Sequence, residues 1–410
     1  GDEPGAGVQW EDGPGAEGAA AQGKQAWGNV DQLPPMSPDE AMRRVAGGSM
    51  LVLDGFRSEA EYGIDARSWI VGPKFKGSKM IPPGLHLVHY SGGHGSTTGF
   101  WLRARAGGVV VRRWDPAVEG LAEGSGMGED DAERLKGAAR GLALDRELAA
   151  YSDQEATAWR ELSHFIDEQT LEAAGIPIGG GDMSCEVVAG DPDEKEHADA
   201  SHQDIAPYFP GPARTARFSN LKSIREASRR AAQTPEERTH GELDHTSTLE
   251  LYLRRRCGGN AKRLLGEFQL AFATFLLMSS LSAFEHWKDM VVLLASSAEA
   301  FSTRPGLMHN FVASLEFQLK NAQEDFFRDQ ICAGSFLHHA VLRLSESAEA
   351  LREAKGGPLL ERQHRLEVRC GTFLAFLKER FNVHIMPSQV THTHPDRGHT
   401  LDDDSTQETG

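Results

Sequence analysis

The feature that most constrains the fold of this chain is an apolar stretch at 262–295. Its middle, 268–284, carries apolar residues on most sides of a helical wheel, and such a helix is stable only when neighbours surround it. Gln269, Thr274 and several serines interrupt the stretch, which favours a buried helix over a membrane span. We therefore predict one long helix at the centre of an all-α domain.

Helical spacing of apolar residues continues along the rest of the C-terminal part of the chain. Further helices are expected at about 307–320, 324–345 and 358–381, with breaks at sites that contain Pro and Gly. The predicted α-helical C-terminal domain covers 246–385.

The N-terminal part shows a different periodicity. Residues 49–115 contain short apolar runs separated by Gly, Pro and Asp, which is typical of strands joined by turns. Phe100 and Leu102 alternate with Trp101, as expected for a strand with two distinct faces. The apolar runs on either side of the Gly107-Gly108 pair predict a hairpin, because Gly permits the positive φ that tight turns require. Helical spacing then returns within 130–172.

Three segments lack a comparable apolar pattern. Residues 1–40 are rich in Gly and Pro and acidic, and 386–410 form an acidic, His-bearing tail, so we predict that both ends are disordered. Residues 173–245 predict a long, mostly irregular linker with a short ordered island at 216–219. The organisation is thus an N-terminal domain at 41–172, a linker, and the helical domain.

The charge of the chain argues against two classes of function. The 410 residues carry a formal net charge of −17, much of it in the two ends, at −7 for 1–40 and −4 for 386–410. A non-specific nucleic-acid binder or a protein attracted to anionic membranes needs a basic surface, so we expect neither direct nucleic-acid nor membrane binding. The Arg254-Arg255-Arg256 run favours a solvated face or a contact with an acidic partner over RNA binding.

The sequence offers no pattern that predicts catalysis, a cofactor or a metal. The Gly-rich segments lack the flanking pattern of a phosphate loop, and no nucleophile motif is present. His286 fits a boundary position on a packed helix better than a general base. The tail histidines are not preorganised to hold Zn²⁺. The chain contains four cysteines, Cys185, Cys257, Cys332 and Cys370, and no two of them form a CxxC pair. Such sparse cysteines predict reduced intracellular thiols.

Two long runs carry a resemblance to a known family. They are EYGIDARSWIVGPKFKGSKMIPPGLHLVHYS at 61–91 and RLLGEFQLAFATFLLMSSLSAFEHWKDMVVLLASSAEA at 263–300. GFWLRARAGGVVVRRWD and QEDFFRDQICAGSFL support it. The chain resembles the AAR-two family of splicing factors over about 42–172 and 216–382, in the order of the family. The resemblance implies an α+β multidomain protein with a β-sandwich-like N-terminal domain, a C-terminal all-α VHS-like helical domain and disordered acidic ends.

The function that this resemblance implies is assembly rather than catalysis. Members of the family are assembly factors of the U5 small nuclear ribonucleoprotein. They bind the RNase H-like and Jab/MPN-like domains of the large U5 scaffold protein, pre-mRNA processing factor eight, and delay docking of the helicase. The resemblance further implies indirect contact with other U5 proteins and a location in both nucleus and cytoplasm. The chain is expected to be monomeric alone. Its tail differs from the family's bridging tail, which puts bridging in doubt.

Candidate partner-binding residues come from aromatic and basic side chains in the matching runs. Aromatic residues dominate both cores and interfaces, so either place remains open for them. Adjacent aromatics on a helix point about 100° apart, so one of the pair at 326–327 is expected to be exposed. The candidates are Trp69, Lys74, Phe75, Lys76, Tyr90, Phe326 and Phe327.

Two other functions stay open at this stage. A VHS-like helical domain is compatible with a peptide-binding adaptor in trafficking. A metal hydrolase assisted by the His-bearing tail is the enzymatic alternative. Ser201, Ser219 and Ser223 lie where added phosphate charge would repel acidic chain, but the sequence selects none of them as a release switch.

Overall fold

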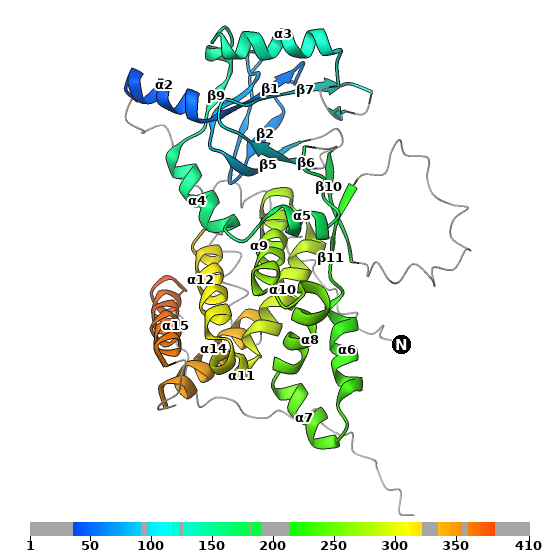
Figure 1. The fold of residues 1–410 in the computed structure, drawn as a ribbon, viewed down its shortest axis with the longest axis vertical. Helices are drawn as coiled ribbons and strands as arrows, with labels where there is room; N and C mark the ends of the chain where they lie inside the picture. Colours follow the sequence, from blue (N-terminus) through cyan, green and yellow to red (C-terminus); the bar gives the residue numbers. More distant parts are fainter. Residues whose placement is uncertain are drawn as a thin grey trace, which may run out of the picture.

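Short strands ended by Gly, Pro and Asp build the N-terminal half, and long helices build the C-terminal half (Figure 1). The computed structural model describes residues 36–91, 97–117, 119–122, 126–179, 182–189, 214–321, 335–353 and 360–381. The strands are β1 Ser49–Asp54, β2 Glu61–Ile64, β3 Arg67–Ile70, β4 Gly77–Ile81, β5 Gly84–Ser91, β6 Thr97–Ala104, β7 Val109–Asp115, β8 Gly120–Leu121, β9 Ala149–Ala150, β10 Met183–Ala189 and β11 Arg214–Phe218.

The helices of the N-terminal half are α2 Pro38–Gly47, α3 Glu129–Arg140, α4 Asp153–Ser163 and α5 Glu168–Ala173. Those of the C-terminal half are α6 Leu221–Ala231, α7 Pro235–Leu243, α8 Thr246–Cys257, α9 Ala261–Met278, α10 Leu281–Ala295, α11 Ala298–Thr303, α12 Pro305–Asn321, α14 Phe336–Glu353 and α15 Leu360–Phe381. The predicted fold class, a β-sandwich-like domain followed by an all-α domain, is confirmed.

The strands form two sheets with buried faces. One sheet has the order β8-β7-β1-β4-β9 and the other β11-β10-β6-β5-β2-β3. Leu51 of β1 and Val88 of β5 belong to the core between the sheets, whereas Val52 packs outward with residues of α3. On the outer face of the second sheet, Leu87 and Trp101 pack with the helices. Each sheet therefore has a covered outer face as well as an inner one.

The predicted hairpin at Gly107-Gly108 is wrong. Although β6 and β7 are consecutive, β6 pairs with β5 and β10, while β7 runs parallel to β1. The Gly107 N–H donates to the carbonyl of Gly48, and the Met50 N–H donates to the carbonyl of Gly108. The turn is thus held against the start of β1, so the chain crosses from one sheet to the other instead of folding back on β6.

The single long helix predicted at 262–295 is also wrong, because two helices occupy this range. Ser279 adopts a left-handed conformation with φ of 60°, and its N–H caps α9 at the carbonyl of Phe275. Ser280 then accepts a hydrogen bond from the Ala283 N–H at 3.2 Å and begins α10. The burial expected for the stretch is present, since most side chains of α9 are buried.

The expectation of a mostly irregular chain at 173–245 is wrong for much of its described part, which covers 173–179, 182–189 and 214–245. Two strands and two helices lie here, and the predicted island at 216–219 overlaps the end of β11. β10 adds to the edge of the second sheet antiparallel to β6, and β11 lies parallel to β10. The helices α12 and α15 agree with the predicted 307–320 and 358–381. The second part of the predicted helix 324–345 lies in α14, and its first part lies outside the described residues.

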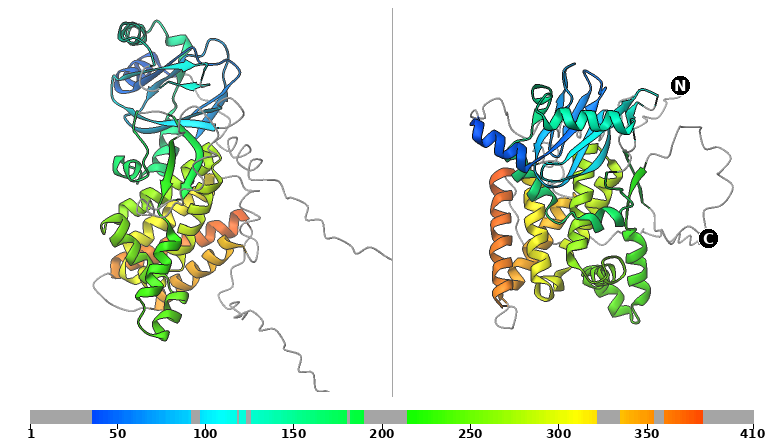
Figure 2. Two further views of the ribbon diagram at one scale, coloured as in Figure 1. Left: turned by 90° about the vertical axis from the view of Figure 1, so that its right-hand side faces the viewer. Right: turned by 45° about the horizontal axis from the view of Figure 1, so that its top comes forward.

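The β half lies directly against the helical half (Figure 2), and one hydrophobic core joins the two. Trp101 of β6 lies 5.9 Å from Trp159 of α4, and both belong to the same buried cluster as α9 and α10. The Trp159 indole N–H donates to the carbonyl of Leu85 at 2.8 Å. The Phe165 N–H donates to Gln269 Oε1 at 2.7 Å. Surfaces at this junction are therefore held in a fixed relation.

Candidate functional site

Two of the predicted partner-binding aromatics lie together at one edge of the β half. Trp69 lies on β3, the last strand of its sheet, and its ring stacks on Tyr62 with centroids 6.0 Å apart. Phe75 contacts the same Tyr62 at 4.8 Å. Both rings are half-buried, and the neighbouring Ile70 is 70% exposed. We call this group, Trp69, Ile70, Lys74, Phe75 and Lys76, the β3-edge surface.

The two predicted lysines lie beside these aromatics. Lys74 is exposed, and Lys76 pairs with Glu147 at 2.8 Å. A shallow pocket of about 500 Å³ separates the turn at 72–75 from the segment 146–149. Aromatic area beside the exposed Ile70 suits contact with another protein, and Lys74 would lie at the polar rim of such a contact.

The remaining predicted residues are placed differently. Tyr90 is fully buried between the sheets, where its hydroxyl donates to Asp182 and accepts from the Leu121 N–H. It is therefore a core residue and not an exposed anchor. Phe326 and Phe327 lie outside the described residues.

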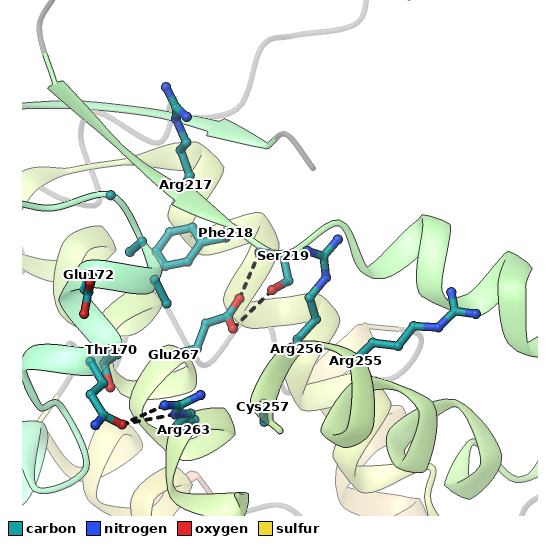
Figure 3. Close-up of a pocket in the computed structure, with 14 residues that line it drawn as sticks. Thr170, Glu172, Arg217, Phe218, Ser219, Arg255, Arg256, Cys257, Arg263 and Glu267 are labelled. Atoms are coloured by element: carbon teal, nitrogen blue, oxygen red, sulfur yellow. Dashed lines mark hydrogen bonds between the residues drawn. The ribbon is translucent and has the colours of Figure 1, made fainter. Parts of the chain in front are cut away.

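A pocket of about 550 Å³ lies at the junction of the two halves. It is enclosed by the end of α5, the end of β11, the last turn of α8 and the first turns of α9 (Figure 3). We call it the junction pocket. Gly258, with φ of 58°, ends α8 and lets the chain turn directly into α9, so Arg255 and Arg256 of α8 and Arg263 of α9 all line the pocket.

Glu267 of α9 forms the floor of the junction pocket. Its Oε1 accepts the Ser219 N–H at 2.9 Å and lies 2.9 Å from His286 Nε2. Its Oε2 accepts hydroxyl hydrogen bonds from Tyr252 and from Ser219. One carboxylate thus joins β11, α8, α9 and α10.

The groups on the pocket floor have pKa values that do not favour catalysis. Burial opposes ionisation of Glu267, but the contacts from His286, Tyr252 and Ser219 outweigh it and hold the pKa of its carboxyl below the usual value. Burial, together with the Glu267 charge, raises the pKa of Tyr252 well above its usual value and that of Cys257 to about 12. A protonated thiol is a poor nucleophile, so Cys257 is not activated for attack on a substrate.

The rim of the junction pocket is basic. Arg217, Arg255 and Arg263 have exposed side chains, and Arg263 donates to Gln169 Oε1 at 2.8 Å. Arg256 is half-buried beside them. Four arginines around two carboxylates, those of Glu172 and Glu267, leave an excess of positive charge in a chain whose total is strongly negative.

Sequence reasoning found only part of this pocket. The Arg254-Arg255-Arg256 run signalled positive charge at this place in the chain. Arg217 is distant from the run in sequence, and Arg263 is separated from it by the turn at Gly258-Gly259. In the sequence, Glu267 directly precedes the apolar stretch 268–284. Its position three residues before the buried Leu270 was a usable signal, because a carboxylate on a buried helix face needs partners.

A second cluster of titratable groups is closed to solvent. Asp65 is fully buried and accepts from His86 Nδ1 and from the Tyr151 hydroxyl, each at 2.6 Å. His86 is 3% exposed. A His–Asp pair can act in proton transfer only where a substrate reaches it, and Asp65 and His86 are closed to solvent. The pair instead links β5 to the turn after β2.

One group within the described part of the chain has the residue types and spacing of a metal site. His240, Asp244 and Glu299 bring their ligand atoms within 4.8 Å of one another. However, Asp244 Oδ1 accepts from Thr246, and its Oδ2 accepts from the Glu299 N–H at 2.9 Å. These hydrogen bonds satisfy N–H groups in the first turns of α8 and α11, which explains the cluster without an ion. No described helix is long and apolar enough to cross a membrane.

Comparisons with known proteins match both halves of the chain. Residues 47–175 match the family model of the AAR2 N-terminal domain, and 220–386 match that of the AAR2 C-terminal repeat region. The chain is 31% identical to a protein named AAR2 homolog from Caenorhabditis elegans, across 74% of this chain and 87% of that protein. Homologs of the same name from Mus musculus and Homo sapiens are 32% and 30% identical, each covering 74% of this chain and 83% of the relative.

Proposed function

The chain belongs to the AAR2 family, and from this premise we propose that it is a non-catalytic assembly chaperone of the U5 small nuclear ribonucleoprotein in pre-mRNA splicing. The observation that carries the proposal is the presence of both family domains in the family's order. The pKa directions at the junction pocket and the closed Asp65 cluster agree with a role that does not depend on catalysis.

The partner in this proposal is the large U5 scaffold protein, bound through its RNase H-like and Jab/MPN-like domains. The shared core supports this partner, because two domains held in a fixed relation can contact two partner domains at once. The β3-edge surface supplies exposed apolar and basic side chains on the β half. Stable complexes of this kind bury roughly 1,600 Å² in total, more than a single pocket supplies.

Delay of helicase docking follows from competition for one surface. A chaperone that binds only helicase-free scaffold raises the population of helicase-free scaffold. The size of this shift is set by the difference between its affinities for the two forms of the scaffold. The same proposal places the protein in the cytoplasm during assembly and in the nucleus at the time of release.

A binding assay by size-exclusion chromatography tests the function. The full chain is mixed with the purified RNase H-like and Jab/MPN-like domains from the same organism at moderate salt. We expect a stable complex with both. Failure to form a complex with either domain would overturn the proposed function, and preferential binding of trafficking cargo peptides would favour an adaptor instead.

Two variants locate the contact on the β half. Ile70→Asp, at a side chain that is 70% exposed, should weaken the complex by about tenfold or more if β3 is in contact. The matched control is Met42→Asp on α2, 56% exposed in the same half of the molecule. Equal effects of the two variants would remove the β3-edge surface from the proposal and leave the family-based function in place.

A further inference from the structure

Positive charge in this acidic protein is concentrated in one stretch of the chain. Residues 214–263 contain twelve Lys or Arg and six Asp or Glu, a balance of +6, whereas the whole chain has −17. This stretch runs through β11, α6, α7 and α8 to the first turn of α9. It therefore includes three walls of the junction pocket.

Two of the pocket arginines, Arg217 and Arg255, are open to an external anion. In the part of the chain that the structure describes, Arg217 and Arg255 form no ion pair and are exposed. Glu267 is the carboxylate at the floor of the pocket, and its oxygens already face Ser219, Tyr252 and His286. The positive charges of Arg217 and Arg255 are thus not neutralised by the acids of the pocket.

The placement of the arginines indicates the kind of ligand. In Figure 3 Arg217 lies on one side of the pocket, Arg255 and Arg256 on the other, and Arg263 below, so the guanidinium groups do not converge on one point. Spaced cations suit a chain with several negative groups better than one compact phosphate. Phe218, the aromatic residue of the lining, is 2% exposed and cannot stack on a base. An acidic peptide fits these features better than single-stranded RNA.

We propose that the acidic segment 396–410 of this same chain binds the junction pocket, with Asp402, Asp403 and Asp404 facing its arginines. This segment contains five acids and one base, and three of the acids are contiguous. The acids of 1–40 are spread as single residues and pairs, so they match closely placed cations less well. An extended chain spans about 3.3 Å per residue, so residues after Phe381 can reach across a domain of this size.

Because the tail and the junction pocket belong to one chain, weak contacts between them are sufficient for binding. A tethered segment has an effective concentration in the millimolar range, so a tail that binds weakly as a separate peptide still occupies its site within the chain. The bound tail would cover the basic rim and compete with any acidic segment of another protein. This inference does not depend on the proposed role in splicing.

The test uses a labelled peptide of residues 396–410 and the full chain. In a neutral-tail variant, Asp402, Asp403 and Asp404 are each replaced by Asn, which leaves the pocket vacant. We expect fluorescence anisotropy to show that the peptide binds this variant about tenfold or more tightly than it binds the wild-type chain, whose own tail competes. Binding should weaken as salt rises.

A second pair of variants tests the site. In the neutral-tail background, Arg217→Ser with Arg255→Ser should reduce peptide affinity about tenfold or more, since charge-assisted contacts are lost. The control makes the same change of charge at Arg43 on α2 and Arg365 on α15, both exposed and outside the pocket. Circular dichroism confirms that all variants are folded.

Three results would overturn the inference. Equal peptide affinity for the wild-type and neutral-tail chains would show that the tail does not occupy the pocket. An equal loss in the Arg43 and Arg365 control would show attraction to net charge alone. Tighter binding of a single-stranded RNA of equal charge than of the peptide would assign the pocket to nucleic acid.

Discussion

His86 is a single residue whose surroundings favour its charged form. Its Nδ1 lies 2.6 Å from Asp65 Oδ2 and its Nε2 lies 2.8 Å from the carbonyl oxygen of Pro82. Both neighbours are acceptors, so only an imidazolium, which carries two N–H groups, satisfies both. Burial lowers the pKa of His86, but Asp65 outweighs burial and the carbonyl of Pro82 adds to it, so the pKa is raised. The Tyr151 hydroxyl, which also donates to Asp65, stays neutral because burial raises its pKa.

This pair predicts a pH dependence of stability. Since the folded pKa of His86 lies above its ordinary value of 6.5, the pair contributes fully below about that pH, and the contribution is lost as pH rises through the folded pKa. His86→Asn should reduce the free energy of unfolding by about 3–5 kcal/mol at pH 6, because it leaves a buried carboxylate without its cation. Urea denaturation between pH 6 and pH 9 measures both effects. A wild-type-minus-variant difference that grows toward pH 9 would contradict the assignment.

At the scale of elements, the positions of the strands were easier to predict than the pairing of one strand with another. The alternation of Phe100 and Leu102 with Trp101 was visible in the sequence, and the structure separates these side chains onto the two faces of β6. The pairing of β7 with β1 was not visible, because it depends on main-chain hydrogen bonds from Gly107 to the distant Gly48. The periodicity of a sequence indicates which face of a strand is buried. The pairing of strands depends on contacts between segments that are far apart in the chain.

The same distinction holds for the helices and the candidate sites. The burial of α9 and α10 was predicted, but the break between them depends on Ser279 in a left-handed conformation, which a Ser-Ser pair only weakly signals. Trp69 and Phe75 were predicted together because they are close in sequence. The junction pocket could not be predicted as a unit, since Arg217 and Arg263 line the same pocket only because Glu267 of α9 holds Ser219 at the end of β11.

Close packing of α5 on α9 predicts opposite effects for two glycine substitutions. A Cβ at Gly266 would lie 2.5 Å from Thr170 Oγ1 and 2.6 Å from the carbonyl oxygen of Phe165. Gly266→Ala should therefore lower the free energy of unfolding by about 1–3 kcal/mol despite the better helix propensity of Ala. At Gly371 on α15 a Cβ would have no neighbour within 4 Å among the described residues, so Gly371→Ala should raise stability by up to about 1 kcal/mol.

Thermal unfolding of the two alanine variants measures this contrast. A shift of the same sign in both would mean that helix propensity dominates and that α5 can move away from α9. In that case the fixed relation between the two halves would be weaker than the contacts at Gln269 suggest.

For the whole molecule, the continuous core determines how the two halves behave. Leu87 and Trp101 of the second sheet share one buried cluster with Phe268 and Trp287 of the helices. Separating the halves would expose these side chains and break the hydrogen bond from Trp159 to the Leu85 carbonyl. Each exposed large apolar side chain costs about 1.5–3 kcal/mol, so separation without unfolding is unfavourable.

We therefore predict that β5, β6, α9 and α10 unfold as one cooperative unit. Native-state hydrogen exchange, followed by mass spectrometry at increasing urea, should give these elements the same free energy of opening and the same urea dependence. Trp159→Ala, which removes a side chain from the junction, should lower the opening energy of the strands and helices together by about 3–5 kcal/mol. Separate opening of the helices in the wild-type chain would contradict a single unit. It would also argue against the proposed simultaneous binding of two domains of the scaffold protein. A chaperone that holds two partner domains at a fixed spacing needs halves that do not move independently.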